Sequence, residues 1–404
     1  MAINSIKFLQ LSDVHLDRPM FGGTLGLATE KAEILRQELK AALAKAITLA
    51  VEEAVDIILI AGDLFEEENL VADTIPFLHD LFRRVSIPVV IAPGNEDFYS
   101  AASHYSNNIS FARFGDVWPE NVHIFRKHEF STLILKDFDG LVISGIAHAT
   151  EPSEQRLLTT KLTGTSANVH IGIMHGSLDD NLPPGKILTQ PFSNQEVFKQ
   201  PFDYLALGHY HESSSLIDER GLIRAAYSGS LCPFELDVKG PFGLQIGTVE
   251  KGGVRKGELS HFQMDDRRII GTHVDVTGLS RNYHVENAIQ KEFEVKQVKQ
   301  NDIVLVELTG SFPTGSRIQL SDALLEKTCF SLRVNTENVK TEWSMNVDPS
   351  LNPSTTEAVF RNRLKDMMDE ADSRGDQTEY IRLQNALYYG LDAIYKSPIK
   401  PRQV

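Results

Sequence analysis

Residues 56–65 read DIILIAGDLF, an unbroken apolar run that ends in a glycine and a carboxylate. Such a run predicts a buried β-strand. A similar run at residues 6–11 precedes it, and another at residues 88–92 follows it. The segments between them, residues 28–54 and about 70–85, carry apolar side chains at helical spacing and predict two amphipathic helices. Strand, helix, strand, helix and strand in succession predict βαβ units with parallel pairing.

The middle of the chain holds further strand candidates, separated by loops rich in Ser, Pro and Gly, and these predict a more antiparallel arrangement. They are residues 123–130, 131–140, 141–148, 168–176 and 203–211. Near residue 268 the pattern changes to a compact alternation of strands and helices, and from about residue 352 it is helical. We therefore expect three parts: residues 1–265, a small α/β unit at 266–340, and a helical C-terminal tail at 341–404 that is suited to binding a partner.

Composition and charge limit the class of protein. Hydrophobic residues make up 42% of the chain and charged residues 24%, as is usual for a globular protein. Cys232 and Cys329 are the only cysteines, so we expect no disulfide framework and a cytoplasmic location. We expect no secretory signal, because the start MAINSIKFLQLSD lacks a basic region followed by an apolar region and a cleavage site. We expect no membrane contact, because no apolar run approaches the roughly 20 residues that cross a bilayer. The net charge of −15 argues against a broad basic face that binds nucleic acid, although the protein could still bind phosphates through metal cations.

Five of the predicted strands end in side chains that can bind a metal. These side chains are Asp13, His15, Asp63, Asn95, His175, His209 and His211. Strand ends converge on one edge of a sheet, so ligands that are distant in sequence can meet there. In an extended segment, side chains two residues apart point to the same face. Asp13 and His15 form one such pair, and His209 and His211 form another. The glycines beside four of these strand ends allow tight turns and close approach of the backbone.

The donor types indicate the metal and the chemistry. Carboxylate, imidazole and amide donors without a thiolate favour Mn²⁺, Fe²⁺ or Zn²⁺. Two carboxylates, four imidazoles and one amide exceed the needs of one ion. They suffice for two ions roughly 3.5–4 Å apart that share a carboxylate, the arrangement used for in-line phosphoryl displacement. Asp63 is the candidate for the bridge because a bridging carboxylate has to be central. A lone histidine at a strand end is usually packed or solvated, but five such junctions in one chain indicate a two-metal site.

The order and spacing of these motifs resemble the calcineurin-like metallophosphoesterase superfamily. Within it, QLSDVHLD, ILIAGDLFE, IAPGNED, IGIMHG, DYLALGHYH and YSGSLCPFELD resemble the DNA repair exonuclease (SbcD-like) branch, over residues 6 to about 240. The unit at about 268–340 resembles the capping domain of that branch in position and pattern only. The resemblance implies an α/β fold, a four-layer sandwich of two mixed β-sheets flanked by helices, followed by a small α/β capping domain and a helical tail.

The resemblance also implies how the ligands divide between two divalent ions, which in the family are usually Mn²⁺. One ion would lie on Asp13, His15, Asp63 and His211, and the other on Asp63, Asn95, His175 and His209. A bridging water or hydroxide would then attack the phosphorus of a phosphodiester. The partners implied are DNA, an SbcC-like coiled-coil ATPase subunit and a second copy of the chain in a homodimer.

One position departs from the family pattern. The residue after the Asn of this turn is normally a histidine, interpreted as the general acid that protonates the leaving oxygen, and here it is Glu96. Glu96 is the acid itself if the site raises its pKa, although two nearby cations favour the ionised form. Alternatively, another group such as His104 or His148 supplies the proton, or the enzyme is slow or specialised. We favour retained but altered activity, because every metal ligand is in place. Asp97 either orients the neighbouring group or caps the segment that follows it, and the cap is the role that we favour.

Three further residues are candidates with an equally simple structural explanation. His148 follows a predicted strand and is a candidate catalytic residue, or a histidine that bonds locally. Ser228 and Ser230 are candidates for binding the substrate phosphate, because short hydroxyls in a glycine turn suit an anion, but a plain turn explains them as well.

The function predicted from the sequence is that of a metal-dependent DNA phosphodiesterase, an exonuclease or endonuclease that acts in DNA repair with an ATPase partner. The first alternative is a phosphatase or small-molecule phosphodiesterase. The second is a metal-bound regulatory subunit that is catalytically weakened because Glu96 replaces the usual histidine.

Overall fold

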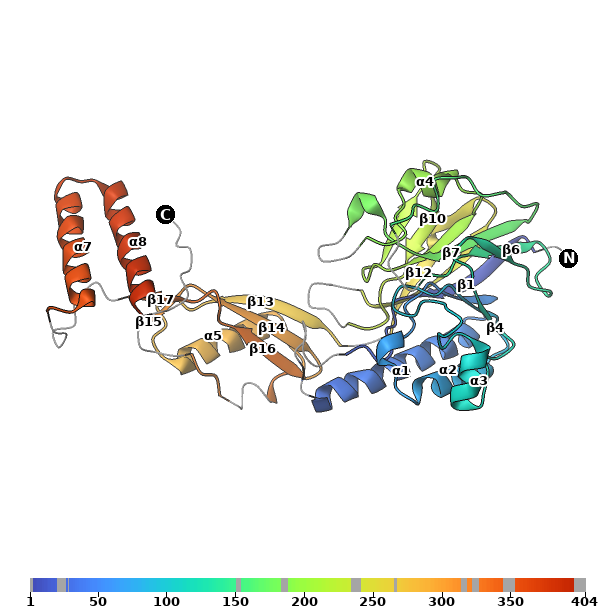
Figure 1. Cartoon of the computed structure of the whole chain (residues 1–404), viewed down its shortest axis with the longest axis horizontal. Helices are drawn as coiled ribbons and strands as arrows, with labels where there is room; N and C mark the ends of the chain where they lie inside the picture. Colours follow the sequence, from blue (N-terminus) through green and yellow to red (C-terminus); the bar gives the residue numbers. More distant parts are fainter. Residues whose placement is uncertain are drawn as a thin grey trace. The chain divides into compact units, whose positions relative to one another are not determined.

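The structure is a computed structural model that describes residues 3–19, 27, 29–149, 154–182, 188–233, 241–264, 267–313, 318–321, 327–343 and 353–395. It consists of two compact units, Met1–Arg267 and Arg268–Val404. Figure 1 shows the elements of each unit, coloured along the chain.

One curled β-sheet forms the centre of the first unit. Its strands are β1 (Ser5–Leu11), β2 (Ile57–Ile60), β3 (Val89–Ile91), β4 (Val122–Ile124), β5 (Ser131–Leu133), β6 (Leu141–Gly145), β7 (Val169–His175), β8 (Tyr204–Gly208), β9 (Ser214–Ile217), β10 (Leu222–Tyr227), β11 (Gly243–Glu250) and β12 (Gly253–Gln263). They are ordered β4-β3-β2-β1-β11-β12-β10-β8-β7-β6-β5, and β9 pairs with β10. The antiparallel hairpin β11–β12 stands in the middle of this order and joins its two halves, because β11 pairs with β1 and β12 pairs with β10.

The pairing agrees with the sequence prediction in the first half and differs in the second. Strands β1 to β4 pair in parallel, as the βαβ pattern predicts. The middle strands were expected to be more antiparallel, but β6, β7, β8 and β10 also pair in parallel. The expectation was wrong for these strands because long connections return the chain to the same end of the sheet before each new strand begins. Antiparallel pairing is concentrated in β9 to β12 and in the short pair β5–β6.

Helices lie on both sides of this sheet. Helices α1 (Thr29–Glu52), α2 (Thr74–Arg83) and α3 (Asn107–Phe114) lie on one side, and α4 (Asn194–Lys199) lies on the other (Figure 1). Two short 3₁₀ turns, η1 (Glu67–Asn69) and η2 (Asp179–Asn181), follow strands β2 and β7. The sequence predicted α1 and α2 but neither α3 nor α4. A capping box at Ser193 and Glu196 defines the start of α4.

The sheet curls on itself and encloses the core. One apolar cluster combines side chains from β1, β2 and β3 with side chains from β6, β7 and β8, which lie at the other end of the strand order. A Cβ placed on Gly145 in β6 would lie 2.3 Å from the ring of Phe125, which follows β4. The two halves of one hydrogen-bonded sheet thus form the two inner layers, with helices outside them. The prediction of a mixed α/β sandwich flanked by helices is confirmed.

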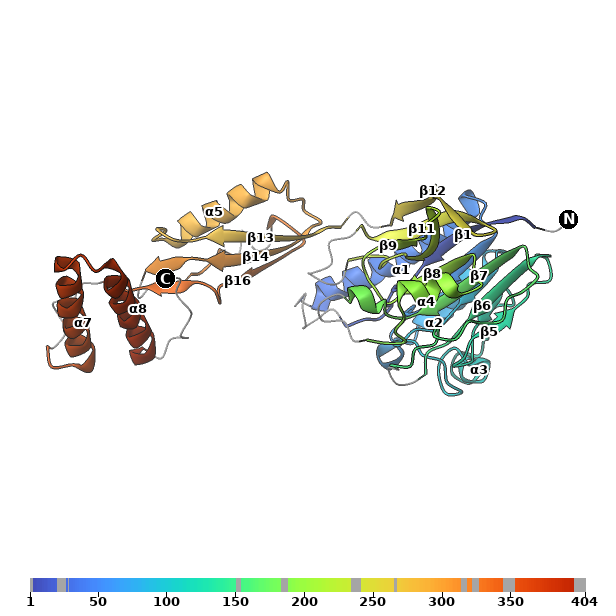
Figure 2. The ribbon, with the colours of Figure 1, turned by 90° about the horizontal axis from the view of Figure 1, so that it is seen from above.

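The second unit contains a small parallel sheet that helix α5 covers on one face. Strands β13 (Ile269–Asp275), β14 (Ile303–Thr309) and β16 (Ser331–Asn335) pair in parallel, and β15 (Ser311–Pro313) pairs with β17 (Lys340–Glu342). Helix α5 (Asn282–Val295) lies along one face of the sheet (Figure 2). It packs through Val285, Ile289 and Phe293 against valines of β13 and β14. The helix expected before β16 falls largely on residues 322–326, outside the described residues.

The chain continues into a helical hairpin, as the sequence predicts. Helix α7 (Thr356–Ser373) and helix α8 (Gln377–Ile394) are joined by a turn in which Gly375 has a φ of 70°. Trp343 packs against Leu387 and Leu391 of α8 and donates its indole N–H to Asp392 over 2.7 Å. Among the described residues, no helix is long and apolar enough to cross a membrane.

Candidate metal centre

The ends of five strands meet at one edge of the curled sheet. The backbone N–H of Asp13 after β1 donates to the carbonyl of Gly62 after β2, over 3.1 Å. The end of β8 lies against the same turn, since a Cβ on Gly208 would lie 1.9 Å from the carbonyl oxygen of Ala61. Only glycine permits this approach. The structure therefore brings together segments that are separated by more than a hundred residues in the sequence.

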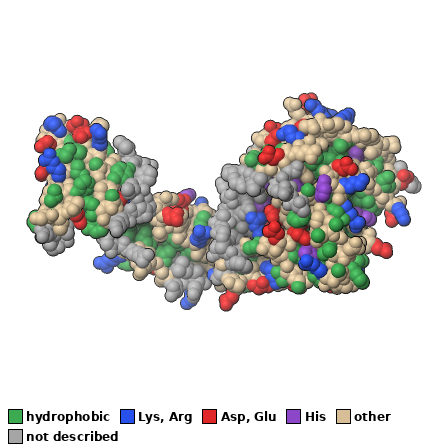
Figure 3. All heavy atoms as spheres, in the orientation of Figure 1, with side chains coloured by type: hydrophobic (Ala, Val, Ile, Leu, Met, Phe, Trp, Pro, Cys, Tyr) green, Lys and Arg blue, Asp and Glu red, His purple; other side chains and the backbone are tan. Residues whose placement is uncertain are grey.

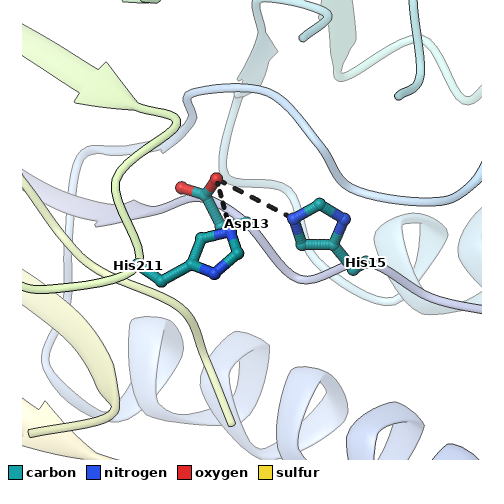
Figure 4. A group of neighbouring side chains, drawn as sticks. All are labelled: Asp13, His15 and His211. Carbon is teal, nitrogen blue, oxygen red and sulfur yellow. Dashed lines mark ion pairs between the residues drawn. The ribbon is translucent and has the colours of Figure 1, made fainter. Parts of the chain in front are cut away.

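The first group of possible ligands contains Asp13, His15 and His211. Asp13 Oδ1 lies 3.9 Å from Nε2 of His15 and 3.7 Å from Nε2 of His211 (Figure 4). All three side chains are buried. One oxygen and two nitrogens directed at the same space can hold a metal ion.

The second group contains Asp13, Asp63 and His175, whose ligand atoms all lie within 4.8 Å of one another. Asp63 Oδ2 lies 3.2 Å from Nε2 of His175 and 3.6 Å from Nε2 of His15. Asp63 thus contacts histidines on both sides and has the central position that a bridging carboxylate requires. Oδ1 of Asn95 lies 3.1 Å from Nε2 of His175 and extends this second group.

His209 lies at the edge of the second group. Its backbone N–H donates to both carboxylate oxygens of Asp13 over 3.1 Å. Its ring centroid lies 5.2 Å from that of His175, with the rings at 73°. The two groups of mutually close ligand atoms include no nitrogen of His209, so its role as a ligand stays a prediction.

Four of the seven predicted ligands have a left-handed backbone. The φ angles of Asp13, His15 and Asp63 are 51°, 51° and 52°, and that of His209 is 106°. Residues other than glycine rarely adopt such angles, and each costs of order 1–3 kcal/mol. Such strain persists only where the surroundings fix the conformation, so its concentration on these residues indicates a functional site.

Hydrogen bonds at the outer nitrogens orient the histidine rings. Nδ1 of His15 lies 2.8 Å from Oε1 of the buried Glu66, and Nδ1 of His175 donates to the carbonyl of Ala61 over 2.9 Å. Each of these bonds leaves Nε2 directed at the centre, which is the tautomer that a metal ligand needs. Ser12 supports Asp13 in the same way through a hydroxyl bond of 2.5 Å to Oδ2.

Asp97 links two of the ligand loops. Its carboxylate accepts hydrogen bonds from the backbone N–H groups of Asp63, Leu64 and Gly94, over 2.6–3.0 Å, and from the hydroxyl of Tyr105 over 2.6 Å. The expectation that Asp97 caps the following segment was therefore wrong, because its backbone donors are all residues before it in the chain and its one later donor is the side chain of Tyr105. Burial and the charge of Asp63 raise the pKa of Asp97 to about 7.

The charges at the centre favour cations. Burial opposes the ionisation of Asp63, but His175 holds the pKa of that carboxyl well below its usual range. Burial likewise lowers the pKa of His175, and Asp63 more than offsets this and raises it to about 9. Burial and the nearby Glu96 carboxylate raise the pKa of Glu66 to about 8. An excess of buried carboxyl groups of this kind is stabilised by divalent ions.

The donor set fits two divalent cations. Buried carboxylates, imidazoles with an oriented Nε2 and one amide oxygen are the ligands of borderline and hard divalent metals, and no cysteine is among them. Glu66 and Asp97 were not predicted as parts of this centre. Glu66 follows Asp63 by three residues in GDLFE, and an acidic residue so close to a bridging carboxylate was the available signal.

Glu96 lies beside this centre with an exposed side chain. Its backbone N–H donates to Asp63 Oδ1 over 2.9 Å, and its Oε1 accepts a hydrogen bond of 2.8 Å from Nδ2 of Asn95. Burial of the surrounding region and the charge of Asp63 raise its pKa.

The two histidines considered as alternative proton donors are both held by other groups. His148 is buried, and its Nε2 donates to the carbonyl of His175 over 2.9 Å. Burial lowers the pKa of His148 to about 4. Nδ1 of His104 lies 2.8 Å from Glu67, and its Nε2 lies 3.0 Å from Arg113. The catalytic role of His148 stays a prediction, and its contact with the backbone of His175 is that of a supporting residue.

Ser228 and Ser230 lie behind the ligand loops. Both are buried, and the Ser228 hydroxyl lies 2.9 Å from that of Ser12. Ser230 forms a parallel bridge with Ser12, and its backbone N–H donates to the carbonyl of His211. These contacts support the loops of Asp13 and His211, and binding of a substrate by either serine stays a prediction.

Comparison with known proteins gives one family and several relatives. The family model described as calcineurin-like phosphoesterase matches residues 6–213, a region that contains all seven predicted ligands. The chain is similar to the uncharacterized metallophosphoesterase YhaO of Bacillus subtilis (strain 168), with 25% identity over 387 residues, which cover 91% of this chain and 90% of that protein.

Two solved structures are also similar. The protein TT1561 of Thermus thermophilus has a TM-score of 0.33 and 11% identity, and the match covers 55% of this chain and 89% of that one. Yfce, a phosphoesterase from E. coli, has a TM-score of 0.29 and 15% identity, with 65% and 94% of the two chains covered.

Proposed function

Because the chain belongs to the calcineurin-like phosphoesterase family, we propose that it is a DNA phosphodiesterase, an exonuclease or endonuclease of DNA repair that uses two divalent ions. The observation that carries the proposal is the cluster of Asp13, Asp63 and His175, whose ligand atoms lie within 4.8 Å of one another. A second group on Asp13 supplies places for another ion. Paired sites of this kind serve in-line displacement at phosphorus.

The residues of the chain hold and orient the reacting groups. Asp13, His15, Asp63 and His211 would hold one ion, and Asp63, Asn95, His175 and His209 the other. When bound, such ions polarise the phosphate and lower the pKa of a water molecule that attacks phosphorus. Glu66 and the carbonyl of Ala61 keep Nε2 of two histidines directed at the ions. Asp97 keeps two ligand loops at a fixed separation.

DNA is favoured over a small ester because a second unit follows the phosphoesterase region. The similarity to the Bacillus subtilis protein extends over 91% of the chain and so includes most of that unit. Hydrolysis of a small ester does not require it. The net charge of −15 disfavours a broad basic face for DNA. Binding of the DNA phosphates through the metal ions is consistent with this charge.

Metal identity, partners and location are part of the proposal. Mn²⁺ suits the mixed oxygen and nitrogen donors, with Fe²⁺ and Zn²⁺ as alternatives. Figure 3 shows hydrophobic side chains in a band on the α7–α8 hairpin. The exposed large hydrophobic residues of the two helices and of the residue that ends α8 are Val359, Met367, Ile394 and Tyr395. This band is our candidate contact for an SbcC-like coiled-coil ATPase.

We also propose a homodimer, which would appear in light scattering as twice the chain mass. Both cysteines, Cys232 and Cys329, are buried, and a reducing cytoplasm is the location that we propose.

Three substrates tested side by side decide between the candidate functions. The full chain is loaded with Mn²⁺ and incubated with end-labelled single- and double-stranded DNA, with bis-p-nitrophenyl phosphate and with p-nitrophenyl phosphate. We expect shortening of DNA from the ends or internal cleavage. Asp63→Asn should abolish it, because the bridging carboxylate is lost, whereas Glu68→Gln on the exposed surface of η1 should not.

Each other outcome supports one of the rivals. Turnover of small esters without DNA cleavage supports a phosphatase or small-molecule phosphodiesterase. Two bound metal ions without any turnover support a regulatory subunit, which the replacement of the usual histidine by Glu96 favours.

A further inference from the structure

The two ends of the Asn95 side chain have different partners. Its Oδ1 lies 3.1 Å from Nε2 of His175 and faces the metal centre. Its Nδ2 donates a hydrogen bond to Oε1 of Glu96 over 2.8 Å. The amide is therefore oriented with its oxygen toward the ligands and its nitrogen toward the neighbouring carboxylate.

This orientation decides whether Asn95 can bind a metal. A side-chain amide binds a hard or borderline cation through its oxygen, because the NH₂ group has no lone pair to offer. A carboxylate accepts hydrogen bonds, so Glu96 can pair with Nδ2 but not with Oδ1. Glu96 thus favours the one amide orientation that presents oxygen to the centre.

The backbone of Glu96 is fixed by two further contacts. Its N–H donates to Asp63 Oδ1 over 2.9 Å, and its carbonyl accepts a hydrogen bond from the N–H of Glu67 over 3.0 Å. Gly94, two residues earlier, approaches Asp63 so closely that a Cβ there would lie 2.2 Å from Oδ1. The Glu96 carboxylate therefore extends from a fixed point back toward Asn95.

We propose that Glu96 is a positioning residue that locks the Asn95 amide for the second metal ion, and that it is not the proton donor to the leaving oxygen. The second part rests on the proposed function. In the hydrolysis, a bond forms between phosphorus and the attacking water oxygen, which gives up its proton to solvent. The bond to the leaving oxygen breaks, and that oxygen takes its proton from solvent. Esters with acidic leaving groups are then cleaved much faster than alkyl esters.

Metal titration tests the positioning role independently of activity. Mn²⁺ binding to the full chain is measured by calorimetry and by the electron paramagnetic resonance of the coupled ion pair. Glu96→Ala should weaken the second site by about 10- to 100-fold, as loss of an outer hydrogen-bond partner does. Glu96→Gln should restore most of the affinity, because its amide oxygen accepts the same bond. The matched control is Glu68→Ala, which removes an exposed glutamate of η1.

Leaving-group dependence tests the second part. The wild type and Glu96→Gln are compared on a p-nitrophenyl ester and on a dinucleotide. A positioning residue changes both rates by the same factor, so their ratio is conserved. A general acid would lose about 10²- to 10⁴-fold on the dinucleotide alone.

The results that overturn the proposal are distinct from those that overturn the function. A Glu96→Gln variant with metal affinity as weak as that of Glu96→Ala, or with a selective loss on the dinucleotide, contradicts the role of Glu96. If the wild type cleaves no ester, the proposed function fails, while the titration still decides whether Glu96 positions Asn95.

Discussion

A single carboxylate, that of Asp97, holds two ligand loops of the metal centre together. It accepts from Asp63 N–H and Leu64 N–H after β2 and from Gly94 N–H after β3. The loops carry Asp63, the predicted bridging carboxylate, and Asn95, the predicted amide ligand. Their separation therefore depends on a residue that is not itself a predicted ligand.

Substitution of Asp97 should cost both stability and metal affinity. Asp97→Ala leaves three backbone donors and the Tyr105 hydroxyl without their acceptor, and each buried unsatisfied group costs about 1–3 kcal/mol. We expect a loss of about 3 kcal/mol or more in urea unfolding. Tyr105→Phe, which removes one bond, should cost about 1 kcal/mol. Equal, small losses in both variants would contradict this role.

The affinity for metal should rise with pH because of His175. Its pKa of about 9 in the metal-free protein means that the ring is protonated at neutral pH. Metal binding needs the neutral ring, so it releases a proton. Between pH 6 and 8 we expect about a tenfold gain in affinity per pH unit from this group. Calorimetry in two buffers of different ionisation enthalpy measures the proton released, and His175→Gln should release one proton fewer.

At the scale of elements, the ladder of β1 and β2 continues into the ligand loops. His15 N–H donates to the carbonyl of Asp63 over 2.9 Å, and Leu16 N–H to that of Leu64 over 3.0 Å. A parallel bridge between Leu16 and Phe65 extends the pairing further. The pairing of the two strands thus continues past their ends, and the paired segments contain the left-handed residues Asp13, His15 and Asp63.

The glycine before Asn95 should tolerate no side chain. A Cβ at Gly94 would lie 2.2 Å from Asp63 Oδ1 and 2.7 Å from its backbone N. We expect Gly94→Ala to destabilise the protein by about 1–3 kcal/mol and to displace Asp63, with loss of metal binding. Gly164→Ala is the control, because the nearest atom to its Cβ would be 3.9 Å away. Thermal unfolding and Mn²⁺ titration give both readouts, and wild-type behaviour of Gly94→Ala would refute the close packing.

At the scale of the whole molecule, every predicted ligand belongs to the first of two compact units. Arg267, at its end, pairs with Glu38 of α1 over 2.7 Å and closes that unit. The chain has two tryptophans, Trp118 in the first unit and Trp343 in the second. Each unit therefore carries its own fluorescent reporter.

A chain truncated after Arg267 should fold and keep its metal affinity, because the core and the site lie within it. Its Trp118 fluorescence should report one cooperative transition. The full chain with Trp118→Phe, which reports through Trp343 alone, serves as the comparison for the second unit. If the truncated chain aggregates or binds no Mn²⁺, the first unit depends on the second for its fold.

Much of the site follows from residue type and spacing alone. The βαβ pattern and the side chains after β1, β2, β3, β7 and β8 are local features, and local features are what periodicity and turn chemistry report. The ligand groups around Asp13 and Asp63 were found in this way. The roles of Glu66 and Asp97 were not, since their partners lie up to 51 positions away in the sequence.

The sequence by itself determined the parallel βαβ units of β1 to β3, the helical hairpin near its end and the seven candidate ligands, because the periodicity of an element and the residue types at its end are local features. Only the tertiary structure decided that β11, with Glu250 opposite Ser5 of β1, joins the two halves of the sheet. It alone decided that the Asn95 amide turns its oxygen toward His175 and its nitrogen toward Glu96. These features depend on contacts between segments that are distant in the sequence, and such contacts form only when the chain folds.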